Sequence, residues 1–203
     1  QPLLPSLANN IKCGNSLIGS DFYNGHQLDL FDEQEQYKVN VFDWRSRDGF
    51  AEIMKDGGFD VVVGNPPYVN IRVLTQVQSE HVKDYFRRVY SCAYRGYDLY
   101  VLFVERGSQI LKPHGLWGMI VPNKIATLEY AARCREMLLK SKSIVSIADT
   151  SGIRVFADAS VYPYVLIWQN SLPLPNHRLA VIHAKSPDDL ANATTTLSVD
   201  QAR

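Results

Sequence analysis

The chain has 203 residues and a mass of 23.0 kDa, and its 46% hydrophobic and 21% charged residues exclude a disordered chain, a collagen and a disulfide scaffold. No apolar run reaches the roughly 18 residues of a membrane span, and the N-terminus lacks a basic signal region, so we expect a cytoplasmic protein without a membrane partner. The 21 basic and 21 acidic residues cancel, so a contact with nucleic acid must be local or be made by another domain.

The clearest predicted element is a strand over residues 59–63, a β-branched apolar run entered from two glycines. Such a run is typical of a parallel strand that is buried on both faces of its sheet. The strand is left through the sequence Gly-Asn-Pro-Pro-Tyr at residues 64–68. The two prolines stop it abruptly because neither can donate a hydrogen bond to a neighbouring strand.

Strands and helices alternate along the rest of the chain. The pattern predicts helices at 76–90, 99–111 and 128–140 and strands at 116–121, 143–148 and 161–169. Asp98 is the expected cap of the second helix, and Glu129 and Arg133 are the expected i,i+4 pair of the third. Pro163 predicts an edge strand or a bulge.

Three further segments complete the elements. We interpret the tyrosine-rich stretch at 90–97 as a loop that is solvated or serves packing. We interpret the arginines within 87–88 and 133–135 as parts of solvated helix faces; the alternative is that they contact phosphates. After Asn170 the chain turns to Pro, Asn, Ser and Thr, which predicts a linker or the start of another domain over 171–203. The alternation as a whole predicts an α/β fold with a mostly parallel sheet, in which ligands bind beyond the carboxyl ends of the strands.

Cysteine and histidine residues form no chemical pattern. Cys13, Cys92 and Cys134 are odd in number and far apart, which predicts buried free thiols. The five histidines have neither H-E-x-x-H nor paired ligand spacing, so we expect no metal site.

The Asn-Pro-Pro-Tyr sequence at 65–68 is the best candidate for chemistry. Pro66 and Pro67 fix two φ angles and restrict the residue before each, so the Asn65 side chain and the Pro66 carbonyl become rigid acceptors. Two such acceptors can converge on one NH₂ group, and Tyr68 adds an aromatic plane. This arrangement suits a planar amine, whose lone pair is delocalised until acceptors favour a tetrahedral nitrogen. The alternative is a simple turn, because Asn-Pro often starts one and Pro-Pro often ends a strand.

The run from Phe59 to Tyr68 resembles motif IV of the S-adenosylmethionine-dependent N6-adenine DNA methyltransferases, and above all the methylase region of fused, Type IIG-like restriction–modification enzymes. Other stretches resemble the remaining motifs in order and spacing over about residues 9–170: they are 10–19 before motif IV, 97–113 and 115–123 as motifs V and VI, and 155–156 with 162–168 as motif VIII.

The resemblance implies a Rossmann-like class I methyltransferase fold whose mostly parallel sheet has one antiparallel strand. It implies methyl transfer to the N6 amine of a flipped adenine. The Asn65 side chain and the Pro66 carbonyl would accept hydrogen bonds from that amine, and Tyr68 and Phe156 would lie against the base. It also implies that S-adenosylmethionine contacts Asn15, Asn65 and Pro67, where Asn15 replaces an aspartate of many relatives. The implied partner is double-stranded DNA, held through a target-recognition domain.

The family's glycine-rich F-x-G-x-G cofactor loop does not occur in this sequence. We therefore expect a partial catalytic domain over 1–170, covering motifs III to VIII, without the N-terminal strands of the full fold, and with weak or no activity alone. The family's strand order is 3-2-1-4-5-7-6. Because strands 1 and 2 would separate the segment at about 10–13 from residues 60–63, we expect that segment to be displaced, to pair irregularly or to pair with another molecule.

Three functions remain open from the sequence. The first is adenine-N6 methylation of DNA within a restriction–modification system, with an endonuclease fused in the same protein. The second is methylation of another planar amine, a glutamine side chain in a protein or an adenine in RNA. The third is a catalytically dead module that binds DNA or supports assembly and retains the motif.

Overall fold

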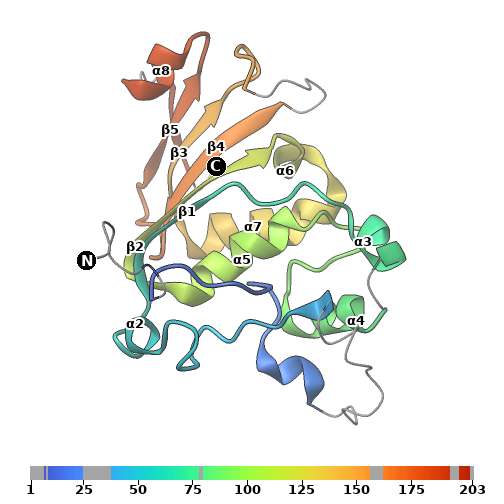
Figure 1. The fold of residues 1–203 in the computed structure, drawn as a ribbon. Helices are drawn as coiled ribbons and strands as arrows, with labels where there is room; N and C mark the ends of the chain where they lie inside the picture. The colour runs from blue at the N-terminus through green and yellow to red at the C-terminus, as the bar shows by residue number, and fades with distance from the viewer. Residues whose placement is uncertain are drawn as a thin grey trace, which may run out of the picture.

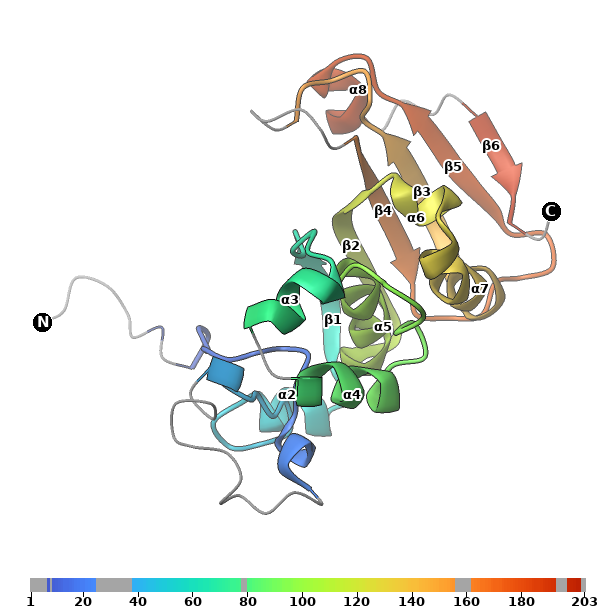
Figure 2. The same cartoon turned by 90° about the vertical axis from the view of Figure 1, so that its right-hand side faces the viewer.

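The computed structural model describes residues 7, 9–24, 38–77, 80–155, 162–192 and 197–201. Its centre is a six-stranded sheet in the order β1-β2-β4-β3-β5-β6, seen in Figures 1 and 2. The strands are β1 (Phe59–Gly64), β2 (Leu111–Pro122), β3 (Ser143–Asp149), β4 (Pro163–Gln169), β5 (Arg178–His183) and β6 (Leu197–Asp200).

Four of the six strands run in one direction. β1 pairs in parallel with β2, and β3 with β5, whereas β4 is antiparallel to both β2 and β3. The mixed α/β class is therefore confirmed, and the order β1-β2-β4-β3 reproduces the 4-5-7-6 part of the expected strand order. β6 is antiparallel to β5, so the sheet has two antiparallel strands, whereas the resemblance implied only one.

The helices fill the connections, and α5 and α7 pack against one face of the sheet (Figures 1 and 2). They are α2 (Ala51–Lys55), α3 (Ile71–Val77), α4 (Glu80–Val89), α5 (Tyr100–Ile110), α6 (Lys124–Thr127), α7 (Ala132–Ser141) and α8 (Pro187–Ala191), with the 3₁₀ turns η1 (Ser20–Tyr23) and η3 (Glu129–Ala131).

Two stacked indoles form the centre of the core between α5 and the sheet. Trp117 on β2 and Trp168 on β4 are fully buried, and their ring centroids are 5.4 Å apart at an interplanar angle of 18°. Gly107 of α5 lies directly over the Trp117 ring, where a Cβ atom would overlap the indole. The helix can approach the sheet this closely because residue 107 has no side chain.

Replacing Gly107 by alanine is expected to lower the free energy of unfolding by about 1–3 kcal/mol, the usual cost of overpacking a core. The sign of this change in unfolding free energy separates a packed from an exposed position, because replacing glycine by alanine in an exposed helix interior would instead stabilise by about 1 kcal/mol. Urea denaturation measures the change. An unfolding free energy equal to or above the wild-type value would show that α5 does not pack on Trp117 as described.

The prediction that residues 59–63 are buried on both faces is wrong. The side chains of Val61 and Val63 are 54% and 78% exposed, although the strand itself forms as expected. In the described part of the chain β1 is an edge strand, and the helices α5 and α7 cover only the other face of the sheet. An apolar run specifies a strand, but the neighbouring elements decide how much of it is buried.

Several element boundaries also differ from the prediction. The first predicted helix, 76–90, corresponds to α4, and a further helix, α3, begins before it at Ile71. The third predicted helix is preceded by α6 and η3, and α7 begins at Ala132. β2 begins at Leu111, immediately after α5, rather than at residue 116. Pro163 lies in β4, which is an interior strand. It is the first residue of that strand, where a missing N–H is tolerated.

The N-terminal segment pairs irregularly, as expected. Asn15 forms an isolated parallel bridge with Val41, and the Phe42 amide donates to the Ile18 carbonyl at 2.8 Å. Among the described residues the segment does not pair with β1. Cys13 of this segment is exposed, so the prediction of three buried thiols is wrong for it and right for Cys92 and Cys134.

The sheet continues beyond residue 170, where the sequence predicted a linker or a new domain. β5 pairs with β3, and β6 pairs with β5. The Gln201 side chain fixes the chain at the end of β6: its Nε2 donates to the Lys142 carbonyl at 2.6 Å, and its Oε1 accepts from the Ile144 amide at 2.8 Å. This part of the chain is therefore part of the same sheet as β1 to β4.

Candidate active site

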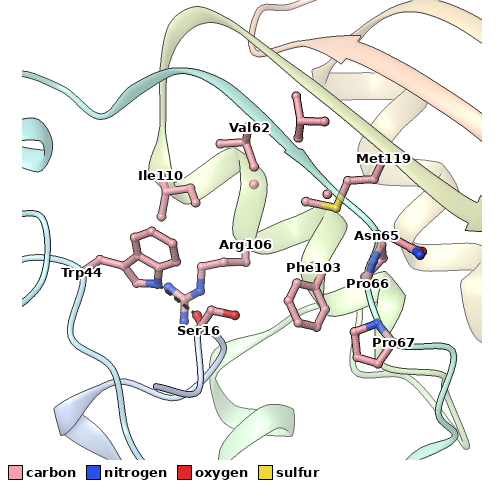
Figure 3. Close-up of a pocket in the computed structure, with 13 residues that line it drawn as sticks. Ser16, Trp44, Val62, Asn65, Pro66, Pro67, Phe103, Arg106, Ile110 and Met119 are labelled. Carbon is pink, nitrogen blue, oxygen red and sulfur yellow. Dashed lines mark hydrogen bonds between the residues drawn. The ribbon is translucent and has the colours of Figure 1, made fainter. Parts of the chain in front are cut away.

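The Asn-Pro-Pro segment lies at the carboxyl end of β1 and at one end of a cleft of about 270 Å³ (Figure 3). Asn65 and Pro67 are exposed, and Pro66 between them is buried. Figure 3 shows the Asn65 amide directed away from the apolar side chains of the cleft, so a ligand can reach it from solvent. Other lining residues are Ser16, Trp44, Val62, Phe103, Arg106 and Met119.

Tyr68 lies beside the cleft and is not among the residues that line it. Its hydroxyl donates to the Ile120 carbonyl on β2 at 2.9 Å, and its ring meets the edge of the Tyr100 ring at a centroid distance of 6.4 Å. Burial raises the pKa of the Tyr68 hydroxyl to about 12. The phenol is therefore neutral at physiological pH, and its ring is held by a fixed hydrogen bond.

The chain after the motif is tied to the tyrosine-rich loop by backbone hydrogen bonds. The Leu99 amide donates to the Val69 carbonyl at 2.8 Å, and the Ile71 amide donates to the Tyr97 carbonyl at 2.9 Å. The two segments form a short bridge in which the position of one fixes the other. The loop thus supports the rigid segment that the two prolines begin.

Asp98 has a different role from the predicted helix cap. α5 has Leu99 as its N-cap and no side-chain cap. The Asp98 carboxylate instead accepts hydrogen bonds from Asn70 Nδ2 and from the Tyr130 hydroxyl, both at 2.8 Å. It therefore links the segment after the motif to η3, over a sequence separation that a local pattern cannot show.

Asn15 is close to the cleft without lining it. Its Oδ1 accepts a hydrogen bond from the Leu17 amide at 3.1 Å, a local turn that uses the side-chain oxygen. The next residue, Ser16, lines the cleft, and its carbonyl accepts from Trp44 Nε1 at 3.0 Å. The structure thus brings the 15–16 segment and the Asn-Pro-Pro segment to one cleft. Phe156 lies outside the described residues.

Two residues that the sequence analysis missed hold the N-terminal segment in place. The Leu17 carbonyl accepts hydrogen bonds from the Tyr90 hydroxyl at 2.7 Å and from Arg106 Nη2 at 3.1 Å. The Arg106 guanidinium lies over the Tyr90 ring, 5.1 Å from its centroid. These partners are more than 70 residues from Leu17 in sequence, so only a tertiary structure reveals them.

The profile of the Eco57I restriction-modification methylase family matches residues 4–156, three quarters of the chain. The chain belongs to this family. A relative of this Eco57I-family chain is the type II restriction enzyme and methyltransferase RM.Eco57I of Escherichia coli, 32% identical over 165 residues, which are 81% of this chain and 15% of that protein. Another is the adenine-specific methyltransferase PglX of Streptomyces coelicolor, 26% identical over 156 residues, 70% of this chain and 12% of that protein.

The fold of the Eco57I-family chain is similar to that of a class I S-adenosylmethionine-dependent methyltransferase from Listeria monocytogenes, with a TM-score of 0.51 and 18% identity over 68% of this chain and 40% of that one. The chain spans about one seventh of the length of RM.Eco57I. Within the described residues, none of the helices is long and apolar enough to cross a membrane.

Proposed function

We propose that the chain is the catalytic part of a DNA methyltransferase of a restriction–modification system, and that it methylates the N6 amine of adenine. The observation that carries this proposal is the placement of Asn65 and Pro66 at an open cleft at the carboxyl end of β1. In α/β sheets this end of a strand is where ligands bind. Family membership and the adenine-specific relative support the choice of DNA and of adenine.

The chain would activate the amine by positioning two acceptors. Asn65 Oδ1 and the Pro66 carbonyl would each accept one N–H of the amine, which favours a tetrahedral nitrogen and directs its lone pair at the methyl donor. Pro66 is buried and its φ angle is fixed, so the acceptors need little reorganisation during the reaction. The alkylated nitrogen is acidic and can lose its proton to water, so a strong general base is unnecessary.

S-adenosylmethionine would supply the methyl group when bound. Asn15, Asn65 and Pro67 would hold it: with Oδ1 of Asn15 in use, the Nδ2 group can donate to an acceptor nitrogen of the cofactor's adenine. Among the residues that the structure describes, those that line the cleft include no Asp or Glu. Because the family's F-x-G-x-G cofactor loop does not occur in this sequence, we propose that this chain alone binds the cofactor weakly.

The substrate class is tested with the native protein, expressed from its complete reading frame and supplied with methyl-labelled S-adenosylmethionine. We expect label in double-stranded DNA and none in RNA or protein. Label in RNA or protein would favour the second function, methylation of another planar amine. An absence of label in all three substrates would mean that the motif is retained in a catalytically dead module.

Tyr68 is expected to contribute through its ring rather than its hydroxyl. Tyr68→Phe should keep methyl transfer within about threefold of wild type, while losing about 1 kcal/mol of stability with the Ile120 hydrogen bond. Tyr68→Ala should lower kcat/KM for DNA by about 10- to 100-fold, because stacking on a base is worth roughly 1–3 kcal/mol. Steady-state kinetics measures both. Equal losses in the two variants would show that the hydroxyl is what matters.

A further inference from the structure

Two exposed arginines lie on the ring of Tyr94 in the tyrosine-rich loop. The Arg133 Cζ atom is 4.4 Å from the ring centroid and the Arg95 Cζ atom is 5.2 Å from it. Arg95 Nε also donates to the Tyr94 hydroxyl at 3.1 Å. A guanidinium over an aromatic ring is attracted by the ring's negative face. The ring therefore holds two cationic groups in fixed positions at the surface.

The predicted ion pair between Glu129 and Arg133 does not form. Glu129 instead pairs with Arg95 at 2.6 Å, and both side chains are more than half exposed. An exposed pair of this kind contributes at most about 1 kcal/mol, so another anion can replace the carboxylate. Within the described residues Arg133 has no acidic group within salt-bridge distance; its Nη1 makes one long contact of 3.4 Å, to the Ser91 carbonyl.

This surface is joined to the candidate active site by the residues that follow the motif. Asn70 Nδ2 donates to the Gly96 carbonyl at 2.9 Å. Arg72, on the first turn of α3, packs on Gly96, where an added Cβ would lie 3.3 Å from the Arg72 Nε atom. Figure 1 shows α3 and α6 at the end of the sheet where β1 and β2 finish. Asn65 directly follows the last residue of β1, Gly64, and so lies at this end.

We propose that Arg95 and Arg133 on the Tyr94 ring, together with Arg72 beside Gly96, bind phosphates of the DNA strand beside the target adenine; these three residues form the arginine cluster. This inference rests on the proposed function. The chain as a whole is neutral, so its contacts with DNA must be local. Guanidinium groups match phosphate oxygens with two parallel donors, and groups already held by a ring lose less freedom on binding. Contacts of this kind position the DNA and do not read its sequence.

The first test measures the DNA affinity of the native protein against salt concentration for Arg133→Ala and Arg95→Ala. Each variant should make the negative slope of log K against log salt shallower by about 0.9 and weaken binding about fivefold at 0.15 M salt, because one counterion fewer is released. The loss should be equal on cognate and unrelated DNA. KM for DNA should rise by the same factor, whereas kcat and the affinity for S-adenosylmethionine should not change.

Two further variants separate phosphate binding from a structural role. Glu129→Gln should bind DNA more tightly than wild type, because it removes the carboxylate that competes for Arg95. Arg133→Lys keeps the charge and should recover most of the salt slope. The matched control is Arg178→Ala: Arg178 on β5 is also exposed and paired with an acid, Asp200, and its removal should leave the slope at the wild-type value.

The arginine-cluster proposal is overturned if Arg133→Ala, Arg95→Ala and Glu129→Gln all show the wild-type slope while the wild-type protein methylates DNA. It is also overturned if Arg178→Ala lowers the slope as much as the cluster variants. Should Arg133→Ala unfold, Arg133→Lys and Glu129→Gln still decide the question. A wild-type protein that neither binds nor methylates DNA would instead refute the proposed function, and the cluster proposal with it.

Discussion

Replacing Asn65 by alanine is expected to lower kcat for methyl transfer by about 10²- to 10³-fold, the usual effect of removing one positioned hydrogen-bonding group from a reacting centre. The Pro66 carbonyl would remain as a single acceptor, so the amine nitrogen would no longer be held in a tetrahedral arrangement. Because Asn65 is exposed and has no packing role in the core, the free energy of unfolding should stay within about 0.5 kcal/mol of wild type.

The matched control for this prediction is Asn192→Ala. Asn192 is also exposed, but it follows α8 at the β5 side of the sheet. Single-turnover kinetics of the native protein with saturating DNA and cofactor isolates the chemical step from binding. If Asn65→Ala kept more than a third of the wild-type rate, Asn65 would not be part of the cradle that activates the amine.

The second large effect is expected at Glu105, a buried carboxylate in α5. It accepts hydrogen bonds from the Ser91 amide and hydroxyl, both at 3.0 Å, and from the Cys92 amide at 2.8 Å. Glu105→Ala would leave these donors without an acceptor, so we expect a loss of about 3 kcal/mol in the free energy of unfolding. The tyrosine-rich loop, which contains Ser91 and Cys92, would also lose its anchor, and this should lower the rate of methyl transfer.

Glu105→Gln keeps one acceptor oxygen and should lose roughly half as much stability. Urea denaturation measures both variants. Glu52→Ala is the matched control, because Glu52 is an exposed glutamate in α2 whose loss should change stability by no more than about 0.5 kcal/mol. A loss below 1 kcal/mol for Glu105→Ala would mean that the loop does not depend on this carboxylate.

The sequence predicted those parts of the fold and site whose signals are local. The run at 59–63 and the two prolines were sufficient for β1 and for the placement of Asn65, Pro66 and Pro67 at a cleft. In these cases the backbone conformation is restricted by the residue itself or by its immediate neighbours in the sequence. A β-branched run favours a strand, and proline fixes φ, regardless of what packs nearby. The order β1-β2-β4-β3 was expected from the resemblance to the methyltransferase family, not from local signals.

The sequence did not predict features that depend on distant partners. Arg106 and Tyr90 converge on Leu17 across more than 70 residues, and Asp98 bonds with Asn70 and Tyr130 instead of capping α5. No periodic pattern in the sequence predicts either set of hydrogen-bond partners. The exposure of Val63 has the same origin, because burial depends on which element covers a strand.

The atom that receives the methyl group decides whether Asn65 and Pro66 act on an amine. DNA treated with the native protein and isotopically labelled S-adenosylmethionine can be digested to nucleosides and separated by mass spectrometry. The cradle formed by Asn65 and Pro66, together with the proposed choice of adenine, predicts that all label appears in N6-methyl-2′-deoxyadenosine, and that Asn65→Ala removes it. Label on a ring carbon of cytosine, which presents no amine to two acceptors, would contradict the account.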